Sequence, residues 1–153
     1  ELSVSSLDDL ATDSFRNVID EIDAIDPAKV RRLVLSSGKV YFDLLKARRA
    51  SGQQDVALAR LEQIYPFPAD EYAALIERYP NATEIVWCQE EPMNQGAWYS
   101  SQHHMRHVIQ RLMPQLHLSY VGRESSAAPA SGYMSVHLEE QKQFINQALT
   151  IDS

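Results

Sequence analysis

The sequence predicts an α/β fold, a three-layer sandwich in which a mainly parallel sheet of four or five strands carries helices on both faces. Short, nearly continuous apolar segments rich in β-branched residues alternate with segments of helical period, and strands that are apolar throughout are typical of a parallel sheet buried on both faces. The length of 153 residues suits one domain, which at this size buries about 70% of its unfolded surface. Right-handed crossovers then place helices on both faces of the sheet.

The first 26 residues are predicted to be a linker from an upstream domain, and the domain proper is predicted to span residues 27–153. The linker is acidic, has a weak apolar period and opens as ELSVSSLDDL without an initiator Met, like the middle of a longer chain. Pro27 disfavours helix at the residue before it. Four apolar residues of the linker suit either one amphipathic turn or pairing with a sheet edge: Val18, Ile19, Ile22 and Ile25.

Four short segments are predicted to be the strands of the sheet. Each is nearly continuous in apolar character and lies between turn-forming residues, as buried strands do. Each is followed by a segment of helical period, which predicts βα units and therefore parallel strands. The predicted strands are Leu33–Ser36, Val56–Gln63, Ile85–Gln89 and Leu118–Val121.

Each helical segment has one apolar face for burial against the sheet. The second helix is predicted to start at Pro68, because proline is favoured in a first turn, and the third to end before Pro114. The predicted buried faces are Val40, Leu44 and Leu45; Tyr72, Leu75, Ile76 and Tyr79; Trp98, Met105, Val108, Ile109 and Leu112; and Leu138, Gln141, Ile145, Ala148 and Leu149.

Composition and charge exclude several classes of partner. The formal charge of -7, from 14 Lys and Arg against 21 Asp and Glu, opposes binding to polyanions, so nucleic acid is not an expected partner. No apolar run approaches the roughly 20 residues that span a bilayer, so no membrane is expected. The lone Cys88 forms no intrachain disulfide, which favours a cytoplasmic or equally reducing setting.

Polar residues follow the predicted strands at the carboxyl edge of the sheet, where ligands of open α/β folds gather. One of these ends, SSGK, resembles a fragment of a phosphate loop, since Gly38 permits a tight turn and the following helix N-terminus favours anions. A complete phosphate loop requires GxxxxGK[ST], so a plain βα turn with Lys39 in solvent is the favoured interpretation. The sequence contains no GxGxxG motif for a dinucleotide.

The other candidates for catalysis or metal binding each have a simpler structural interpretation. The consecutive Glu90 and Glu91 point in opposite directions and cannot act as a carboxylate pair, so a role in shaping the loop is favoured. His103 and His107 share a helix face but have no third ligand nearby in sequence, which argues against a metal site. Cys88 ends an apolar strand, where a free thiol usually packs as a small hydrophobe. The sequence therefore nominates no catalytic residue and no metal site.

Several longer blocks have a specific pattern. The chain contains SSGKVYFDLLKARR, ARLEQIYPFP, QEEPMNQGAWYSSQHH and YVGRESSAAPASGYMSVH in this order, after an SSLDDLA segment. With these blocks the chain closely resembles the C-terminal domain family of the bacterial-type 2-oxoglutarate dehydrogenase decarboxylating component, over about residues 1–150. The resemblance implies a fold like the transketolase C-terminal domain, with a mainly parallel sheet and one antiparallel strand.

What the resemblance implies for function concerns a longer parent protein. That parent is a homodimeric oxidoreductase of the tricarboxylic acid cycle, which uses thiamine diphosphate and magnesium to decarboxylate 2-oxoglutarate. It passes the succinyl group to lipoyl-lysine on the dihydrolipoyl succinyltransferase component of a multienzyme complex. The cofactors bind to upstream domains of the same chain. The present chain is therefore expected to hold no cofactor, to supply no catalytic residue, to be inactive alone, and to serve in structure and dimer formation.

The resemblance also implies a regulatory site, because the family's C-terminal domain is associated with an allosteric pocket for a nucleotide or acetyl-coenzyme A. The candidates are residues near the carboxyl edge whose donors suit a phosphate. They are Ser37, Lys39, Gln102, Arg106 and Arg123.

Two other interpretations stay open. The chain could be the same domain of a 2-oxoadipate dehydrogenase or a 2-oxoglutarate decarboxylase, because substrate choice is made upstream. It could also be a free-standing flavodoxin-like binding domain. A domain cut from a dimer would expose an apolar patch. Trp98, Tyr99 and Met105 are candidates for that patch, although each also suits the core.

Overall fold

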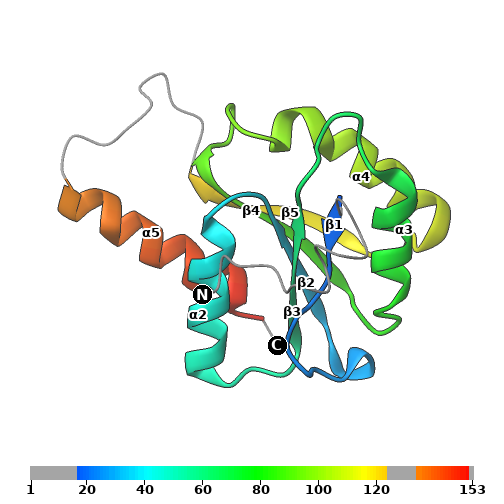
Figure 1. Ribbon diagram of the computed structural model, residues 1–153, viewed down its shortest axis with the longest axis horizontal. Coiled ribbons are helices and arrows are strands. Elements are labelled where there is room, and N and C mark those ends of the chain that lie inside the picture. The colour runs from blue at the N-terminus through cyan, green and yellow to red at the C-terminus, as the bar shows by residue number, and fades with distance from the viewer. Residues whose placement is uncertain (1–16, 124–133, 152–153) are drawn as a thin grey trace, which may run out of the picture.

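The apolar segments of the chain form a five-stranded sheet with the strand order β1-β3-β2-β4-β5. The computed structural model describes residues 17–123 and 134–151 (Figure 1). Four strands run parallel, and the two-residue β1 pairs antiparallel with β3 at one edge. The strands are β1 (Val18–Ile19), β2 (Arg32–Ser36), β3 (Val56–Leu61), β4 (Glu84–Pro92) and β5 (His117–Arg123).

Helices cover both faces of this sheet, which confirms the predicted three-layer sandwich. One core lies beneath α3 and α4, and a second lies beneath α2 and α5, on the opposite side of the sheet (Figure 1). The helices are α2 (Val40–Ser51), α3 (Ala69–Glu77), α4 (Trp98–Leu112) and α5 (Met134–Leu149), and a short 3-10 turn, η1, spans Pro27–Lys29.

The strands are apolar throughout because each one contributes to both cores. In β2, Leu33 and Leu35 face α3 and α4, whereas Val34 faces α2 and α5. The same alternation holds in β4, where Trp87 belongs to the first core and Cys88 to the second. Side chains of successive strand residues point to opposite faces, so a strand between two helical layers has no face left for polar residues.

The four predicted parallel strands are confirmed, and their limits differ from the predictions at several ends. β3 ends at Leu61 rather than Gln63, and β5 is longer than predicted at both ends. The largest difference is in β4, which continues to Pro92 because a register shift between Gln89 and Pro92 lets the polar residues pair with β5. Polarity alone marked these residues as a loop, and the pairing with β5 overrides it.

The four predicted helices are also confirmed. Gly52, in the left-handed conformation with φ 73°, ends α2, and Pro68 directly precedes α3. The predicted buried faces hold except that Gln141 is only partly buried and that Leu112 and Leu138 are 37% and 54% exposed. Leu112 is the last residue of α4. The prediction that Leu112 and Leu138 are buried was wrong.

The segment before Pro27 packs against the domain. Val18 and Ile19 pair with Leu61 and Arg60 of β3, which is the sheet-edge pairing that the sequence left open. Residues 17–26, the described part of the predicted linker, therefore lie against the sheet, and the boundary at residue 26 stays a prediction. The role of residues 1–16 as a connection from an upstream domain lies outside the described residues and stays a prediction.

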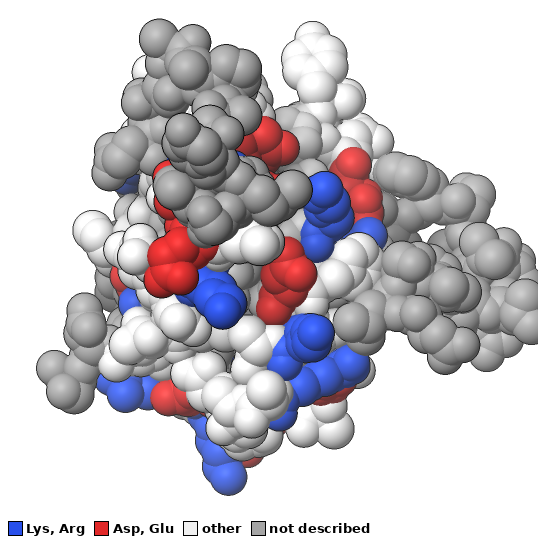
Figure 2. All heavy atoms as spheres, turned by 90° about the vertical axis from the view of Figure 1, so that its left-hand side faces the viewer, with Lys and Arg blue, Asp and Glu red and all other residues white. Residues whose placement is uncertain are grey.

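Basic and acidic side chains are interspersed on the face that carries α2 and α5, as Figure 2 shows for its described atoms. The described part of that face therefore presents no extended field of one sign. Among the described residues, no helix combines the length and apolar character needed to cross a membrane.

Candidate functional site

The carboxyl ends of β2, β3, β4 and β5 lie at one edge of the sheet, because these strands are parallel. Two polar segments occupy this edge: the turn of residues 37–39 between β2 and α2, and the polar end of β4 with the loop of residues 93–97 that follows it. Ligands of open parallel sheets bind at this edge. It is therefore the first place to look for a site.

The side chain of Gln89 organises the loop after β4. Gln89 is only 2% exposed, and its amide nitrogen donates to the carbonyls of Glu91, Pro92 and Gln95 at 3.1, 2.8 and 2.7 Å. Its Oε1 accepts from the indole of Trp87 at 2.9 Å and from the backbone N–H of Trp98 at 3.2 Å. One buried amide thus joins β4, the loop and the first turn of α4.

Two glycines allow the backbone to pack closely around Gln89. A Cβ on Gly96, which has φ 69°, would lie 3.2 Å from Gln89 Oε1. A Cβ on Gly122 would lie 2.6 Å from the Gln89 carbonyl oxygen and 2.7 Å from the Tyr120 hydroxyl. A side chain at Gly122 is therefore incompatible with this packing.

A second polar group lies at the carboxyl ends of β2 and β3, on the face that α2 covers. Ser36 and Arg60 are register partners in the two strands, and the Arg60 guanidinium lies 5.0 Å from the ring centroid of Tyr41 in α2. Ser36 Oγ, Tyr41 Oη and Arg60 Nε are buried and have no hydrogen-bond partner within the part of the chain that the structure describes. Burial raises the pKa of the Tyr41 hydroxyl. The hydroxyl therefore stays protonated and neutral, and it can donate a hydrogen bond.

The predicted contacts Ser37 and Lys39 lie together in the turn beside this polar group. Gly38 has a positive φ of 79°, which fits the predicted tight βα turn. Lys39 is exposed and Ser37 is partly buried. The N-cap residue Lys39 makes no capping hydrogen bond with its side chain among the described residues, and the first backbone N–H groups of α2 carry the partial positive charge of a helix N-terminus.

The other predicted contacts lie on two different layers. Arg123 ends β5 on the α5 side, where its Nε is 3.2 Å from Glu140 Oε2 and its Nη1 donates to the Glu90 carbonyl at 3.2 Å. Gln102 and Arg106 lie on α4, across the sheet from α5. The structure therefore brings Ser37 and Lys39 together in one turn but separates Arg106 from Arg123.

The remaining candidates have the surroundings of structural residues. Cys88 is completely buried, and burial raises the pKa of its thiol to about 12, so it packs as a small hydrophobe, as predicted. His103 and His107 are exposed on α4. Within residues 17–123 and 134–151, no group of three or more His, Cys, Asp or Glu side chains is arranged to hold a metal ion.

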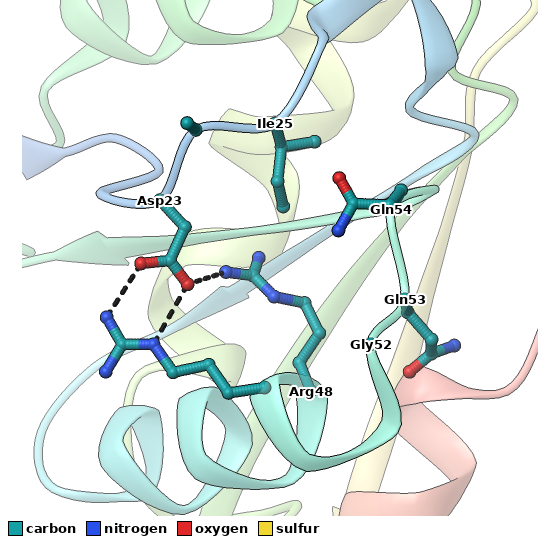
Figure 3. A pocket seen from close by; sticks show the side chains of 8 residues that line it. Asp23, Ile25, Arg48, Gly52, Gln53 and Gln54 are labelled. Atoms are coloured by element: carbon teal, nitrogen blue, oxygen red, sulfur yellow. Dashed lines mark hydrogen bonds and ion pairs between the residues drawn. The ribbon is translucent and has the colours of Figure 1, made fainter.

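A polar cavity of about 190 Å³ lies at the opposite end of the strands, between the chain before η1 and the end of α2 (Figure 3). Figure 3 shows the Asp23 carboxylate between two guanidinium groups, those of Arg48 and Arg49, with contacts of 2.7 Å to each. Asp23 and Glu21 together compensate the two guanidinium charges, because Glu21 also pairs with Arg48, so the described lining of the cavity offers no free cation to an anionic ligand. Its lining residues are Asp23, Ala24, Ile25, Arg48, Arg49, Gly52, Gln53 and Gln54.

Comparison with protein families assigns the chain. Residues 4–149 match the family described as 2-oxoglutarate dehydrogenase C-terminal. The chain belongs to this family. The match covers both halves of the sheet and the whole carboxyl edge.

Full-length relatives support membership in the 2-oxoglutarate dehydrogenase C-terminal family. The chain is 55% identical over 149 residues to the 2-oxoglutarate dehydrogenase E1 component of Azotobacter vinelandii and 52% identical over 149 residues to that of Haemophilus influenzae (strain ATCC 51907 / DSM 11121 / KW20 / Rd). Each alignment covers 97% of this chain and 16% of the relative. The chain thus spans about a sixth of the length of these relatives.

A solved structure extends the likeness to the fold. The described architecture resembles a split gene transketolase, an inactive beta4 tetramer, with a TM-score of 0.52 and 14% sequence identity. The likeness covers 80% of this chain and 40% of the transketolase chain. It supports the predicted transketolase C-terminal domain-like fold of this family member.

Two features of this family member were missed by the sequence analysis. One is the buried Gln89. Because alternate residues of a strand share a face, its position two residues after Trp87 could have predicted that it is buried beside the indole. The other is the polar contact of the N-terminal segment with Arg48, which joins residues 27 positions apart and has no local signature.

Proposed function

We propose that this chain is a structural module of a 2-oxoglutarate dehydrogenase E1 component, and that the active site lies in other domains of the longer protein. The observation that carries this proposal is the family match over residues 4–149, combined with relatives of which the chain spans only 16%. In this proposal the longer protein oxidatively decarboxylates 2-oxoglutarate in the tricarboxylic acid cycle and passes succinyl to the dihydrolipoyl succinyltransferase component.

The described residues do not fit thiamine diphosphate with magnesium. Mg²⁺ prefers carboxylate and other oxygen ligands in octahedral geometry, and the carbonyls of Glu91, Pro92 and Gln95 at the carboxyl edge already accept hydrogen bonds from Gln89. Within the described residues, no group of three or more His, Cys, Asp or Glu side chains is arranged around an ion. We assign the cofactor site to the upstream domains and derive no catalytic step for this chain.

Calorimetric titration tests this assignment. The chain and the longer E1 protein are each titrated with thiamine diphosphate and magnesium, and 2-oxoglutarate-dependent reduction of ferricyanide is measured for both. We expect binding and turnover only for the longer protein. Tight binding or turnover by the 153-residue chain alone would overturn the proposal. It would favour the alternative of a free-standing flavodoxin-like enzyme or binding domain.

Kinetic measurements on the longer E1 protein distinguish a 2-oxoglutarate dehydrogenase from the two related enzymes, a 2-oxoadipate dehydrogenase and a 2-oxoglutarate decarboxylase. The relatives are named for 2-oxoglutarate, so we expect a higher kcat/KM for 2-oxoglutarate than for 2-oxoadipate. The reverse preference would assign the chain to a 2-oxoadipate dehydrogenase. Decarboxylation without succinyl transfer to lipoyl-lysine would assign it to a 2-oxoglutarate decarboxylase.

We also propose that the chain contributes to a homodimer in the cytoplasm. Among the exposed large apolar side chains, Tyr65 and Tyr99 are 92% and 60% exposed, and aromatic residues are enriched in protein interfaces. Trp98 and Met105 are 6% and 0% exposed, so Tyr99 alone of the three predicted patch residues suits docking. Light scattering of the longer protein tests this: Tyr65→Ala with Tyr99→Ala should raise the dimer dissociation constant, and an unchanged constant would exclude this surface.

We propose that the regulatory phosphate site is centred on Ser37 and Lys39 rather than on all five predicted contacts. Ser37 and Lys39 precede the N-terminus of α2, which favours a phosphate, whereas Gln102, Arg106 and Arg123 contribute only to a ligand that reaches across the edge of the sheet. Titration with AMP or acetyl-coenzyme A should shift the NMR signals of Ser37 and Lys39. Lys39→Gln should weaken binding more than Lys46→Gln, which removes an exposed charge of the same helix. Equal effects would remove the turn from the site.

A further inference from the structure

The edge of β3 is only partly covered by β1. Val18 and Ile19 pair with Leu61 and Arg60, and the Glu62 amide donates to the Asn17 carbonyl at 2.7 Å. β1 then ends, whereas β3 continues back to Val56. Unpaired backbone groups at a sheet edge can recruit another strand. The part of β3 beyond β1 therefore needs other partners.

Two side chains supply these partners. The Leu58 amide donates to Glu21 Oε1 at 2.8 Å, and the Val56 carbonyl accepts from Arg48 Nη1 at 3.1 Å. Leu58 and Val56 lie in the same alternating series as Arg60 and Glu62, whose backbone groups face β1. The carboxylate of Glu21 and the guanidinium of Arg48 thus occupy the positions that a longer β1 would fill with its own backbone.

The same two side chains bind each other in the interior. The side chains of Arg48 and Glu21 are 2% and 4% exposed, and Arg48 Nη2 donates to Glu21 Oε2 at 2.7 Å. Arg48 Nη2 also donates to Asp23 at 2.7 Å. Removing one partner of a buried ion pair leaves an uncompensated charge in the interior. Removing either side chain alone is therefore expected to destabilise the closed segment more than removing one partner of an exposed ion pair would.

The segment of residues 17–26 makes few apolar contacts, so it is held to the domain mainly by polar contacts. Ile22 is 53% exposed, and only Val18 and Ile25 of the segment pack against the core. At its start, Asn17 donates to Glu71 at 2.9 Å, and the Tyr79 hydroxyl donates to Asp20 at 2.6 Å. If residues 17–26 detached from the domain, these contacts would break together with those of Glu21 and Asp23. We therefore expect the segment to open as one cooperative unit.

We propose that residues 17–26 form a strap closed by a side-chain latch, in which the buried pair of Glu21 and Arg48 completes the edge of β3 that β1 leaves open. Releasing the latch frees the whole strap and unmasks that edge while the central strands stay folded. The proposal is independent of the proposed function, because it concerns only contacts within this chain.

Native-state hydrogen exchange of the 153-residue chain, at increasing low concentrations of denaturant, tests the strap. We expect the amides of Leu58 and Glu62 to exchange through a shared opening that requires less free energy than exchange of the Val86 amide in central β4. If all three amides exchange with one common free energy, the strap does not open separately from the domain, and the proposal fails. This measurement needs no variant.

The variant Glu21→Gln tests the latch itself. It keeps an acceptor near the Leu58 amide but removes the charge that faces Arg48. We expect exchange at Leu58 and at Glu62 to accelerate about tenfold more than exchange at Val86. Glu77→Gln, a matched loss of an exposed carboxylate on α3, should change all three by less than about twofold. Equal acceleration at Leu58 and Val86, or none at Leu58, would contradict the latch.

Discussion

The indole Nε1 of Trp87 lies 2.9 Å from the side-chain oxygen of Gln89, two residues further along the same strand. Both side chains face the layer of α3 and α4, since alternate residues of a strand share a face. The completely buried indole thereby finds an acceptor inside the protein, as a buried Trp N–H normally does. The interior of the sheet and the loop at its carboxyl edge are therefore coupled through one amide.

Replacing Gln89 with Leu should destabilise the domain by about 3 kcal/mol. The substitution keeps apolar bulk but removes five hydrogen bonds, so that the indole of Trp87 and several backbone carbonyls lose a buried partner. Urea unfolding followed by tryptophan fluorescence measures the change. Gln110→Leu, on the exposed face of α4, is the control and should stay within about 0.5 kcal/mol of wild type. Equal stabilities of the two variants would contradict this role of Gln89.

Alanine at Gly122 should cost more stability than alanine at Gly52. At Gly52 the left-handed φ of 73° costs alanine about 1 kcal/mol, and no atom lies within 4 Å of the new Cβ. At Gly122 the Cβ would meet the Gln89 carbonyl oxygen at 2.6 Å, and a backbone atom cannot move aside without disturbing the pairing of β4 with β5. Thermal unfolding of both variants gives the comparison, and a smaller loss at Gly122 would show that the edge of the sheet relaxes easily.

The architecture could be predicted because its determinants are local. The apolar runs around Leu33, Val56, Ile85 and Leu118 and the helical periods between them suffice to place four parallel strands and four helices. The limits of β4 could not be obtained in this way. Its last residues are polar, and they become strand only because β5 lies beside them, which is a contact between distant parts of the chain.

The strap and the candidate site were less accessible to prediction for the same reason. β1 has two residues, too few to produce a period, and its acidic neighbours look like a solvated linker until Arg48 is placed next to Glu21. Of the predicted phosphate contacts, the sequence could place Ser37 and Lys39 together in one turn. It could not reveal that Arg123 contacts Glu140 on α5, whereas Arg106 lies over the Trp98 ring on the other layer.

The contribution of Asp23 to stability should depend on pH. Hydrogen bonds from Arg49, and then from Arg48, lower the pKa of this carboxyl below 3.8, against the opposing effect of burial. A lowered folded-state pKa means that the stabilisation is complete above the unfolded-state pKa and is lost as the pH falls through the folded-state pKa. The stability difference between wild type and Asp23→Asn should therefore be constant above about pH 5 and should shrink below pH 3.8.

Urea unfolding of both proteins between pH 3 and pH 7 checks this expectation. Glu77→Gln serves as the control for the loss of one negative charge from the surface. A difference between wild type and Asp23→Asn that is as large at pH 3 as at pH 7 would mean that the ionised carboxylate is not what stabilises the fold. The stabilisation would then come from packing around Asp23.

Cys88 should be unreactive in the native protein and reactive only after unfolding. Burial raises its pKa to about 12, so that at pH 8 only about one thiol in ten thousand is ionised, and the thiolate is the reactive form. Labelling with a chromogenic disulfide reagent at pH 8 should be slow in buffer and complete within minutes in urea. Ser100→Cys, at an exposed position of α4, provides a reactive thiol for comparison in the same protein. Rapid labelling of Cys88 in folded wild type would show that the core beneath α2 and α5 opens readily, and the thiol would then no longer qualify as a purely structural residue.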